Sequence, residues 1–276
     1  MAASHVIDQV RSSVLLLATR EPDLFDPTDV ESHVRTRDGL IHMFCKHHSQ
    51  SHNGKYDAAT ISGRLVETLK WRKAVDMNGS LGEDFPLELW TRNPMSVYLD
   101  DEYFVILYIT RNEGRISDRW TQLTRRFILH VHNKYTLEAV HSGRKVVMLS
   151  DGSHISWSNI DISLHSQTVK LMDKHFPCIA EVMCVSGLPS ILTPLANFFT
   201  RFVLPPAIRK VFKVVTPGTI TDFVKGELVP VQCGGKIKLQ DILHFYIIEP
   251  RSVKNNPEEW RLEEWEAKKV LESCTS

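Results

Sequence analysis

Apolar and polar residues follow different patterns on the two sides of Pro94. On the N-terminal side, apolar residues recur about every three or four positions, which is typical of helices that bury one face. The clearest case covers 57–75, with apolar positions at Ile61, Leu65 and Leu69. The pattern predicts that about the first 90 residues are helical.

A second N-terminal helix is expected upstream of this one. Asp38 is placed to cap a segment whose apolar positions include Leu40, Met43 and Phe44. The stretch His47–Gly54 is polar and ends in a glycine. We therefore expect it to be a polar loop that joins the two helices.

On the C-terminal side of Pro94, the apolar residues form short continuous runs rich in residues that favour strands. These runs are Tyr103–Ile109, Lys145–Leu149, Glu181–Val185 and Val211–Val215. Continuous apolarity predicts strands that are covered on both faces, as in a mostly parallel sheet. Helix-length segments separate or follow them, at Ser117–Ala139, Ile160–Phe176 and Ser190–Val203. This alternation predicts βαβ units and therefore an α/β fold.

The expected domain boundaries follow from these changes of pattern. We predict a helical extension over 1–85, an α/β domain over 86–250 and a charged C-terminal segment over 251–276. Within that last segment a helix is expected at Pro257–Leu271, because proline suits the first helical turn and acidic residues favour its positive end.

The segment Ser190–Val203 is apolar around most of a helix rather than along one stripe. Its apolar positions are Leu192, Leu195, Phe198, Phe199, Phe202 and Val203. Such a helix is either buried on all sides in the core or covers something apolar that is not protein. Prolines at both ends, Pro189 and the pair that follows Leu204, favour a hinged lid over an embedded core helix.

Composition and charge exclude several classes of protein. The 276 residues are 42% apolar and 24% charged, which excludes a disordered or fibrous chain. The 33 basic residues balance the 33 acidic ones, which argues against a nucleic-acid-binding protein. No stretch approaches the roughly 20 apolar residues of a membrane span. Five cysteines without a CxxC pair are typical of reduced thiols, so we expect a cytoplasmic protein that meets membranes only peripherally.

A series of short motifs runs through residues 40–235. Thr68–Lys73 carries an L-x-W-R-x pattern, and Lys55–Asp57 is similar to a K-F-D motif. His175–Pro177 places a proline before a predicted strand, and Pro189 follows that strand. In order and spacing, these motifs resemble the CRAL-TRIO lipid-transfer family.

The resemblance continues beyond that strand. Phe202, Pro205 and Lys210 match an F-L-x-P-x-x-x-x-K stretch, and Val229–Gly235 matches an L-P-x-x-x-G-G ending. The nearest similarity is to the lipid-binding domain of motile-sperm-domain-containing proteins. The resemblance implies an N-terminal helical bundle and an α/β cup with a mostly parallel sheet. It also implies that Ser190–Val203 is a gate helix, which closes the cup over one apolar ligand.

The resemblance further implies binding or exchange of a lipid, with no catalysis, cofactor or metal. The apolar residues of the gate helix would line the ligand pocket. Lys210 matches a head-group residue of the family. Independently of the resemblance, Arg201, Arg209 and Lys210 cluster near this helix, which would suit a lipid head group or an anionic membrane surface, with a solvated basic face as the alternative. Members that bind phosphatidylinositol have a glutamate and a threonine where this chain has Cys178 and Ala207. Because a buried inositol phosphate requires several charge-assisted partners, we expect poor phosphatidylinositol binding.

A gate with so much apolar surface would promote aggregation if it stayed open in water. We therefore expect a closed resting state. In that state at least two of the three phenylalanines, Phe198, Phe199 and Phe202, are expected to face the interior of the cup.

Other residues that could support chemistry have simpler explanations. Cys45, His47, His48 and His52 are metal-ligand types, but no second ligand pair follows at zinc spacing, so a polar loop is favoured. The run Asp151–His154 is expected to be a turn that Asp151 caps, because no G-x-S-x-G motif is present. Three functions stay open: a lipid-binding or lipid-transfer protein, an adaptor that binds a protein partner, and a hydrolase of an apolar substrate, which the missing motif disfavours.

Overall fold

The structure is a computed structural model that describes residues 4–79, 95–99, 102–109, 126–127, 129–130, 132–156 and 162–238. The helix expected at Pro257–Leu271 lies outside the described residues, and the one expected at Ser117–Ala139 lies within them only in part. The boundary predicted at residue 85 also falls outside them.

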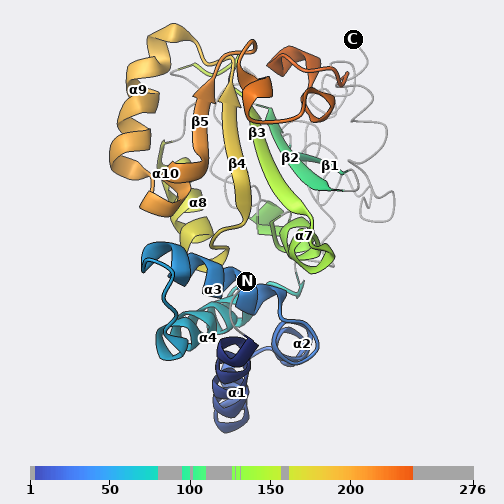
Figure 1. Ribbon diagram of the computed structural model, residues 1–276, viewed down its shortest axis with the longest axis vertical. Coiled ribbons are helices and arrows are strands. Elements are labelled where there is room, and N and C mark those ends of the chain that lie inside the picture. The colour runs from blue at the N-terminus through green and yellow to red at the C-terminus, as the bar shows by residue number, and fades with distance from the viewer. Residues whose placement is uncertain are drawn as a thin grey trace, which may run out of the picture.

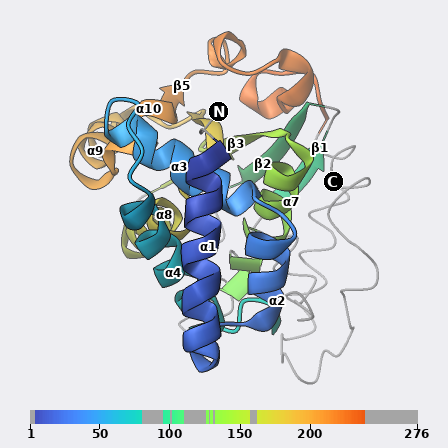
Figure 2. The ribbon, with the colours of Figure 1, turned by 60° about the horizontal axis from the view of Figure 1, so that its bottom comes forward.

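The N-terminal region is helical, as the periodicity predicts. Its α-helices are α1 (Ser4–Arg20), α2 (Pro27–Val30), α3 (Gly39–Ser51) and α4 (Ala58–Ala74). They gather at one end of the sheet, and α1 lies against α3 and α4 (Figures 1 and 2). The Asp57 carboxylate caps α4, since it accepts a hydrogen bond from the Ala59 backbone N–H at 3.1 Å.

Two expectations for this region are wrong. The stretch expected to be a loop from His47 continues α3 as far as Ser51, because His47 and His48 are buried. The helix ends only where Asn53 and Gly54 adopt positive φ angles of 53° and 83°. Asp38 does precede α3, but its side chain makes no capping hydrogen bond.

The sheet has five strands in the order β1-β2-β3-β4-β5. They are β1 (Met95–Leu99), β2 (Tyr103–Ile109), β3 (Lys145–Asp151), β4 (Ala180–Ser186) and β5 (Phe212–Val215). Strands β2 to β5 are parallel and correspond to the four predicted apolar runs. The short strand β1 was not predicted, and it pairs antiparallel with β2. The α/β class with a mostly parallel sheet is therefore confirmed.

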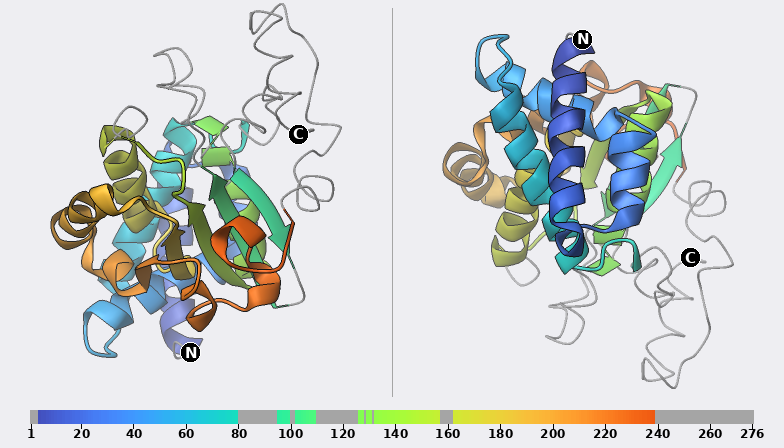
Figure 3. Two further views of the ribbon diagram at one scale, coloured as in Figure 1. Left: turned by 90° about the horizontal axis from the view of Figure 1, so that it is seen from above. Right: turned by 90° about the horizontal axis from the view of Figure 1, so that it is seen from below.

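The two faces of the sheet carry separate apolar clusters. Ile106, Val146 and Met148 pack with residues of α7 (Leu137–Ser142) and α8 (Ile162–His175), and we call this the helix face. On the opposite side, Val105, Leu107, Val147 and Leu149 pack with the segment after β5, and we call this the outer face. That segment is drawn in orange to red in Figures 1 and 3.

A buried arginine joins the N-terminal helices to the rest of the molecule. Arg72 of α4 donates to both carboxylate oxygens of Asp29, each at 2.8 Å, and to the Asn133 side-chain oxygen at 2.7 Å. Asn133 lies in a π-helical turn (His132–Thr136) directly before α7. One continuous apolar cluster also runs from α1 to the helix face. The helical extension is therefore part of the same packed body.

Candidate functional site: gate segment and Cys178 cluster

The predicted gate helix is one uninterrupted helical segment from Ser190 to Val203. It consists of a 3₁₀ turn (Ser190–Leu192), α9 (Thr193–Phe198) and a π-helical turn (Phe199–Val203). Extended residues flank it, Pro189 before and Leu204 after. We call residues 190–203 the gate segment, which lies beside β5 (Figure 1).

The inner side of the gate segment is packed against the protein. Leu192 is 1% exposed, and Phe199 lies against the apolar cluster of the helix face. Phe212 of β5 and Met183 of β4 contribute to that cluster from the sheet. A continuous apolar layer therefore extends from the helix face of the sheet to the inner side of the gate segment.

The outer side of the gate segment is also apolar, and it faces solvent. Ile191, Phe198 and Phe202 are 72%, 56% and 65% exposed. The rings of Phe198 and Phe202 touch, with their centroids 5.1 Å apart. Only Phe199 of the three phenylalanines packs on the core cluster, so the expectation that at least two face inward is wrong for this conformation.

The remaining predicted gate and head-group residues lie on or near this segment. Leu195 and Val203 are half-buried, and Arg201 is exposed with its guanidinium 5.3 Å from the centre of the Phe202 ring. Arg209 belongs to α10 (Pro206–Val211) and donates to the Leu204 carbonyl at 3.0 Å. Lys210, next along α10, is exposed.

Cys178 lies between α3 and α10, at the turn before β4. Its thiol donates to the Gln50 side-chain oxygen at 3.1 Å, and its sulfur lies 3.9 Å from Nδ1 of His47. Burial raises the pKa of this thiol, and the positive charge of Lys46 opposes the shift. The group is therefore a neutral thiol that donates a hydrogen bond.

Further charges surround Cys178. Lys46, Arg64 and Lys210 each lower the pKa of its thiol, while Asp173 raises it. We call Cys178, Lys46, Arg64 and Lys210 the Cys178 cluster. Sequence reasoning from the resemblance brought Cys178 and Lys210 together, but it missed His47 and Gln50, because a loop was expected there.

The residues weighed for catalysis or metal binding occupy structural positions. The Asp151 carboxylate accepts from the Ser153 backbone N–H at 3.0 Å and from its hydroxyl at 2.6 Å, which forms the expected turn. Cys233, within the Val229–Gly235 ending, is fully buried, and this burial raises the pKa of its thiol to about 12, so the thiol is neutral. Within the described ranges, no group of three or more His, Cys, Asp or Glu side chains could hold a metal ion.

No described helix has both the length and the apolar character that crossing a membrane requires. Cys45, Cys178, Cys184 and Cys233 are free thiols.

The structure is an α/β fold with helices on one face of a mostly parallel sheet and with the gate segment beside its edge strand. The family model of the CRAL/TRIO domain matches residues 98–235, half of the sequence. The chain therefore belongs to the CRAL/TRIO family, whose members are generally binding or transfer proteins rather than enzymes.

Among solved structures, the chain is similar to the one titled "Crystal structure of Sfh5". The match has a TM-score of 0.67 and 13% sequence identity, and it covers 98% of this chain and 97% of that one. At this identity the similarity supports the fold alone. No curated protein matches the sequence.

Proposed function

We propose that this protein binds one lipid or similarly apolar molecule on the helix face and exchanges it with membranes through the gate segment. The observation that carries the proposal is the apolar outer side of that segment. Ile191, Phe198 and Phe202 form a solvent-exposed patch, although the inner side already satisfies the packing of the core. Exposed apolar patches of this kind mark contact with a membrane or a partner protein.

The two sides of the gate segment have separate tasks in this proposal. The inner side, with Leu192 and Phe199, covers the apolar layer where the ligand binds. The outer side enters the bilayer interface, and Arg201 and Arg209 contact anionic head groups. Enclosing a lipid chain gains roughly 25 cal/mol per Å² of apolar surface, which holds the ligand while the protein is in water.

Opening of the gate would occur at its ends. Pro189 and Pro205 flank the segment in extended conformations, so a rotation there moves the segment without breaking its helical hydrogen bonds. The π-helical turn over Phe199–Val203 adds a second place where the helix can rearrange.

The Cys178 cluster limits the choice of head group. Lys46, Arg64 and Lys210 supply positive charge for a phosphate, whereas the neutral thiol replaces the carboxylate that would accept from inositol hydroxyls. Unsatisfied hydroxyls at a buried site cost free energy, so the protein favours lipids with a simpler head group over phosphatidylinositol.

Mass spectrometry of an organic extract of natively purified protein tests the ligand. We expect about one lipid per chain, as for a single enclosed site. An extract without lipid, together with no saturable binding of a fluorescent phospholipid, would refute ligand binding.

Vesicle co-sedimentation of the double variant Phe198→Ser/Phe202→Ser tests the gate. Lipid binding should persist, while association with vesicles that contain anionic phospholipid is lost. Leu16→Ser is the matched control, because Leu16 is a large apolar residue that is also about half exposed, at 51%, but lies on α1. Equal vesicle binding by all three proteins would refute the membrane role.

An adaptor function is the second candidate, because the same exposed patch could bind a protein. It predicts that the natively purified protein carries no lipid and that the double variant changes no lipid-transfer rate.

A further inference from the structure

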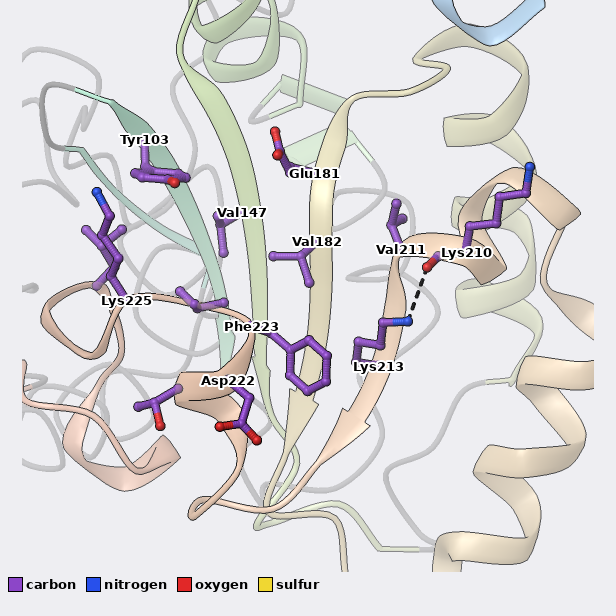
Figure 4. A pocket seen from close by; sticks show the side chains of 13 residues that line it. Tyr103, Val147, Glu181, Val182, Lys210, Val211, Lys213, Asp222, Phe223 and Lys225 are labelled. Carbon is purple, nitrogen blue, oxygen red and sulfur yellow. Dashed lines mark hydrogen bonds between the residues drawn. The ribbon is translucent and has the colours of Figure 1, made fainter. Parts of the chain in front are cut away.

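A cavity lies on the outer face of the sheet, on the side opposite the helix face. Its volume is about 490 Å³, and its lining includes Tyr103, Val147, Val182, Lys213, Phe223 and Leu228. Figure 4 looks onto it, with the strands as its floor and Phe223 over the centre. The volume falls within the roughly 300–1,000 Å³ of small-molecule sites. Because Val147 and Val182 belong to the outer-face cluster, this cavity is separate from the proposed lipid site.

The lining of this cavity is mixed, and its apolar part comes from the sheet and from the segment after β5. Val147 and Leu228 are buried side chains of the outer-face cluster, and Val182 lies partly buried against it. Phe223 is 46% exposed, an unusual position for a large apolar ring on a segment that otherwise buries Ile220 and Val224. The ring therefore has apolar surface left for a ligand.

Lys213 places a positive charge in this apolar setting. Along β5, residue 215 faces the same side and is a valine that joins the outer-face cluster, so the pattern of the strand gives no packing reason for a lysine at 213. Its ammonium donates to the Lys210 carbonyl at 3.3 Å and lies 5.9 Å from the centre of the Phe223 ring. Among the described residues it has no carboxylate partner, and Asp222 lies on the other side of the ring (Figure 4).

Four other charged residues line the cavity, the acids Glu181 and Asp222 and the lysines Lys210 and Lys225. Lys225 pairs with Glu102 at 2.7 Å and lies over the Tyr103 ring at 4.9 Å. Lys210 points away from the cavity, in keeping with its charge acting on Cys178. Lys213 is therefore the cation placed to receive an anionic group at this site.

We infer that this cavity is a second ligand site, which takes a long-chain carboxylate. The carboxylate would bind the ammonium of Lys213, and the alkyl chain would lie over Val147 and Val182 beneath Phe223. An isolated half-buried cation beside an uncovered apolar surface is complementary to an amphiphile with one negative end. This inference is independent of the proposed gate function, because the two sites lie on opposite faces of the sheet.

Fluorescence titration with dansyl-undecanoate, displaced by dodecanoate, tests the site. We expect saturable binding by the full chain. Lys213→Gln should weaken dodecanoate binding about tenfold, the effect of losing one charge-assisted hydrogen bond. Dodecanol has the same chain without the charge. Its affinity, measured by displacement of the probe, should differ less than about twofold between Lys213→Gln and the wild type. Lys236→Gln is the control, because Lys236 is an exposed lysine of the same segment that pairs with Glu227.

A second variant tests the apolar part of the site. Phe223→Ser should weaken the binding of dodecanoate and of dodecanol alike. Because the ring is 46% exposed, the variant should stay folded, which a melting curve checks. The gate variant Phe198→Ser/Phe202→Ser should bind dodecanoate as the wild type does. Native mass spectrometry should detect dodecanoate bound together with phospholipid.

Three results would overturn the inference: no saturable binding by the wild type, unchanged affinity in Lys213→Gln, or displacement of dodecanoate by phospholipid. The last result would place dodecanoate in the proposed lipid site instead. A gate that fails in vesicle assays would leave the dodecanoate titration unaffected, so failure of one proposal is distinguishable from failure of the other.

Discussion

In the chain, α8 precedes β4 and the gate segment follows it, and these two helical segments bury their apolar residues in different ways. On α8, Val169 and Met172 join the core cluster, while the lysines at 170 and 174 face solvent. The gate segment has an equivalent inner side but carries phenylalanines on its outer side as well. Since α8 shows that one apolar stripe is enough to attach a helix to this sheet, the second stripe on the gate segment requires an explanation outside the fold.

The comparison predicts the largest effects for charges placed on the packed sides. Met172→Asp in α8 should lower the free energy of unfolding by about 3–5 kcal/mol, because an unpaired charge would be buried. Phe199→Asp in the gate segment should lower it by about 1–3 kcal/mol, because Phe199 is only partly buried. The outer-side change Phe198→Asp/Phe202→Asp should stay within about 0.5 kcal/mol of the wild type for each substitution. Urea denaturation followed by circular dichroism measures all three.

The outcome separates two interpretations of the gate segment. If the outer-side variant is as unstable as Met172→Asp, the segment is a core helix and the exposed patch is not available to a membrane. If Phe199→Asp is as stable as the wild type, the inner side is not packed as the structure shows.

Acidification should weaken the attachment of α8 but not the outer side of the gate segment. His175 is the last residue of α8. Its ring stacks on that of Trp71 of α4, with the ring centroids 3.9 Å apart, and its Nδ1 lies 3.0 Å from the Thr68 hydroxyl. Burial lowers the pKa of His175 from 6.5 to about 4, so the unfolded chain takes up this proton first as the pH falls. The stability that neutral His175 contributes is complete above pH 6.5 and is lost as the pH falls toward about 4.

A pH series of urea denaturation curves measures this effect. The variant His175→Gln should lose stability less steeply between pH 6.5 and 4 than the wild type does. In this variant, the free energy of unfolding should still fall with pH to some extent, because burial also lowers the pKa of His33 and His132 to about 4. Identical slopes for wild type and variant would contradict the prediction. The gate segment contains no histidine or acidic residue, so binding to phosphatidylcholine vesicles should not follow the same pH dependence.

The same comparison shows where sequence reasoning succeeds. The four parallel strands are continuous apolar runs, and α4 combines a helical period with an aspartate cap, so each carries its own local signal. For α8 the limits at Ile162 and His175 lie close to the predicted ones. In these elements local preference and tertiary packing agree.

The errors arise where tertiary contacts decide. Strand β1 is short and gains its stability from pairing with β2. The histidines of α3 look like a polar loop in the sequence, yet His47 and His48 are buried beside the turn that carries Cys178. On the gate segment, apolar residues on all sides leave the inward face undetermined, because periodicity alone does not show which side the sheet covers.

The smallest expected effect concerns lipid choice at the Cys178 cluster. The double variant Cys178→Glu/Ala207→Thr should raise the rate of phosphatidylinositol transfer between vesicles about fivefold, with little change for phosphatidylcholine. The added carboxylate would stand among Lys46, Arg64 and Lys210, whose charges already act on residue 178. It would accept from inositol hydroxyls while the cations hold the phosphate. Fluorescent phosphatidylinositol and phosphatidylcholine, measured in parallel, separate a change of selectivity from a change of overall transfer.

Two further variants determine whether charge is the cause. Cys178→Gln/Ala207→Thr has nearly the same size as the glutamate variant but lacks the negative charge, so it should gain less phosphatidylinositol transfer. Adding Lys210→Met to the glutamate variant should remove most of the gain, because the phosphate would then lose a cation that lies close to residue 178. If the wild type already transfers phosphatidylinositol as fast as phosphatidylcholine, the neutral thiol is no obstacle to inositol. The other groups around it, Gln50 and His47 of α3, would then have to supply the missing acceptors.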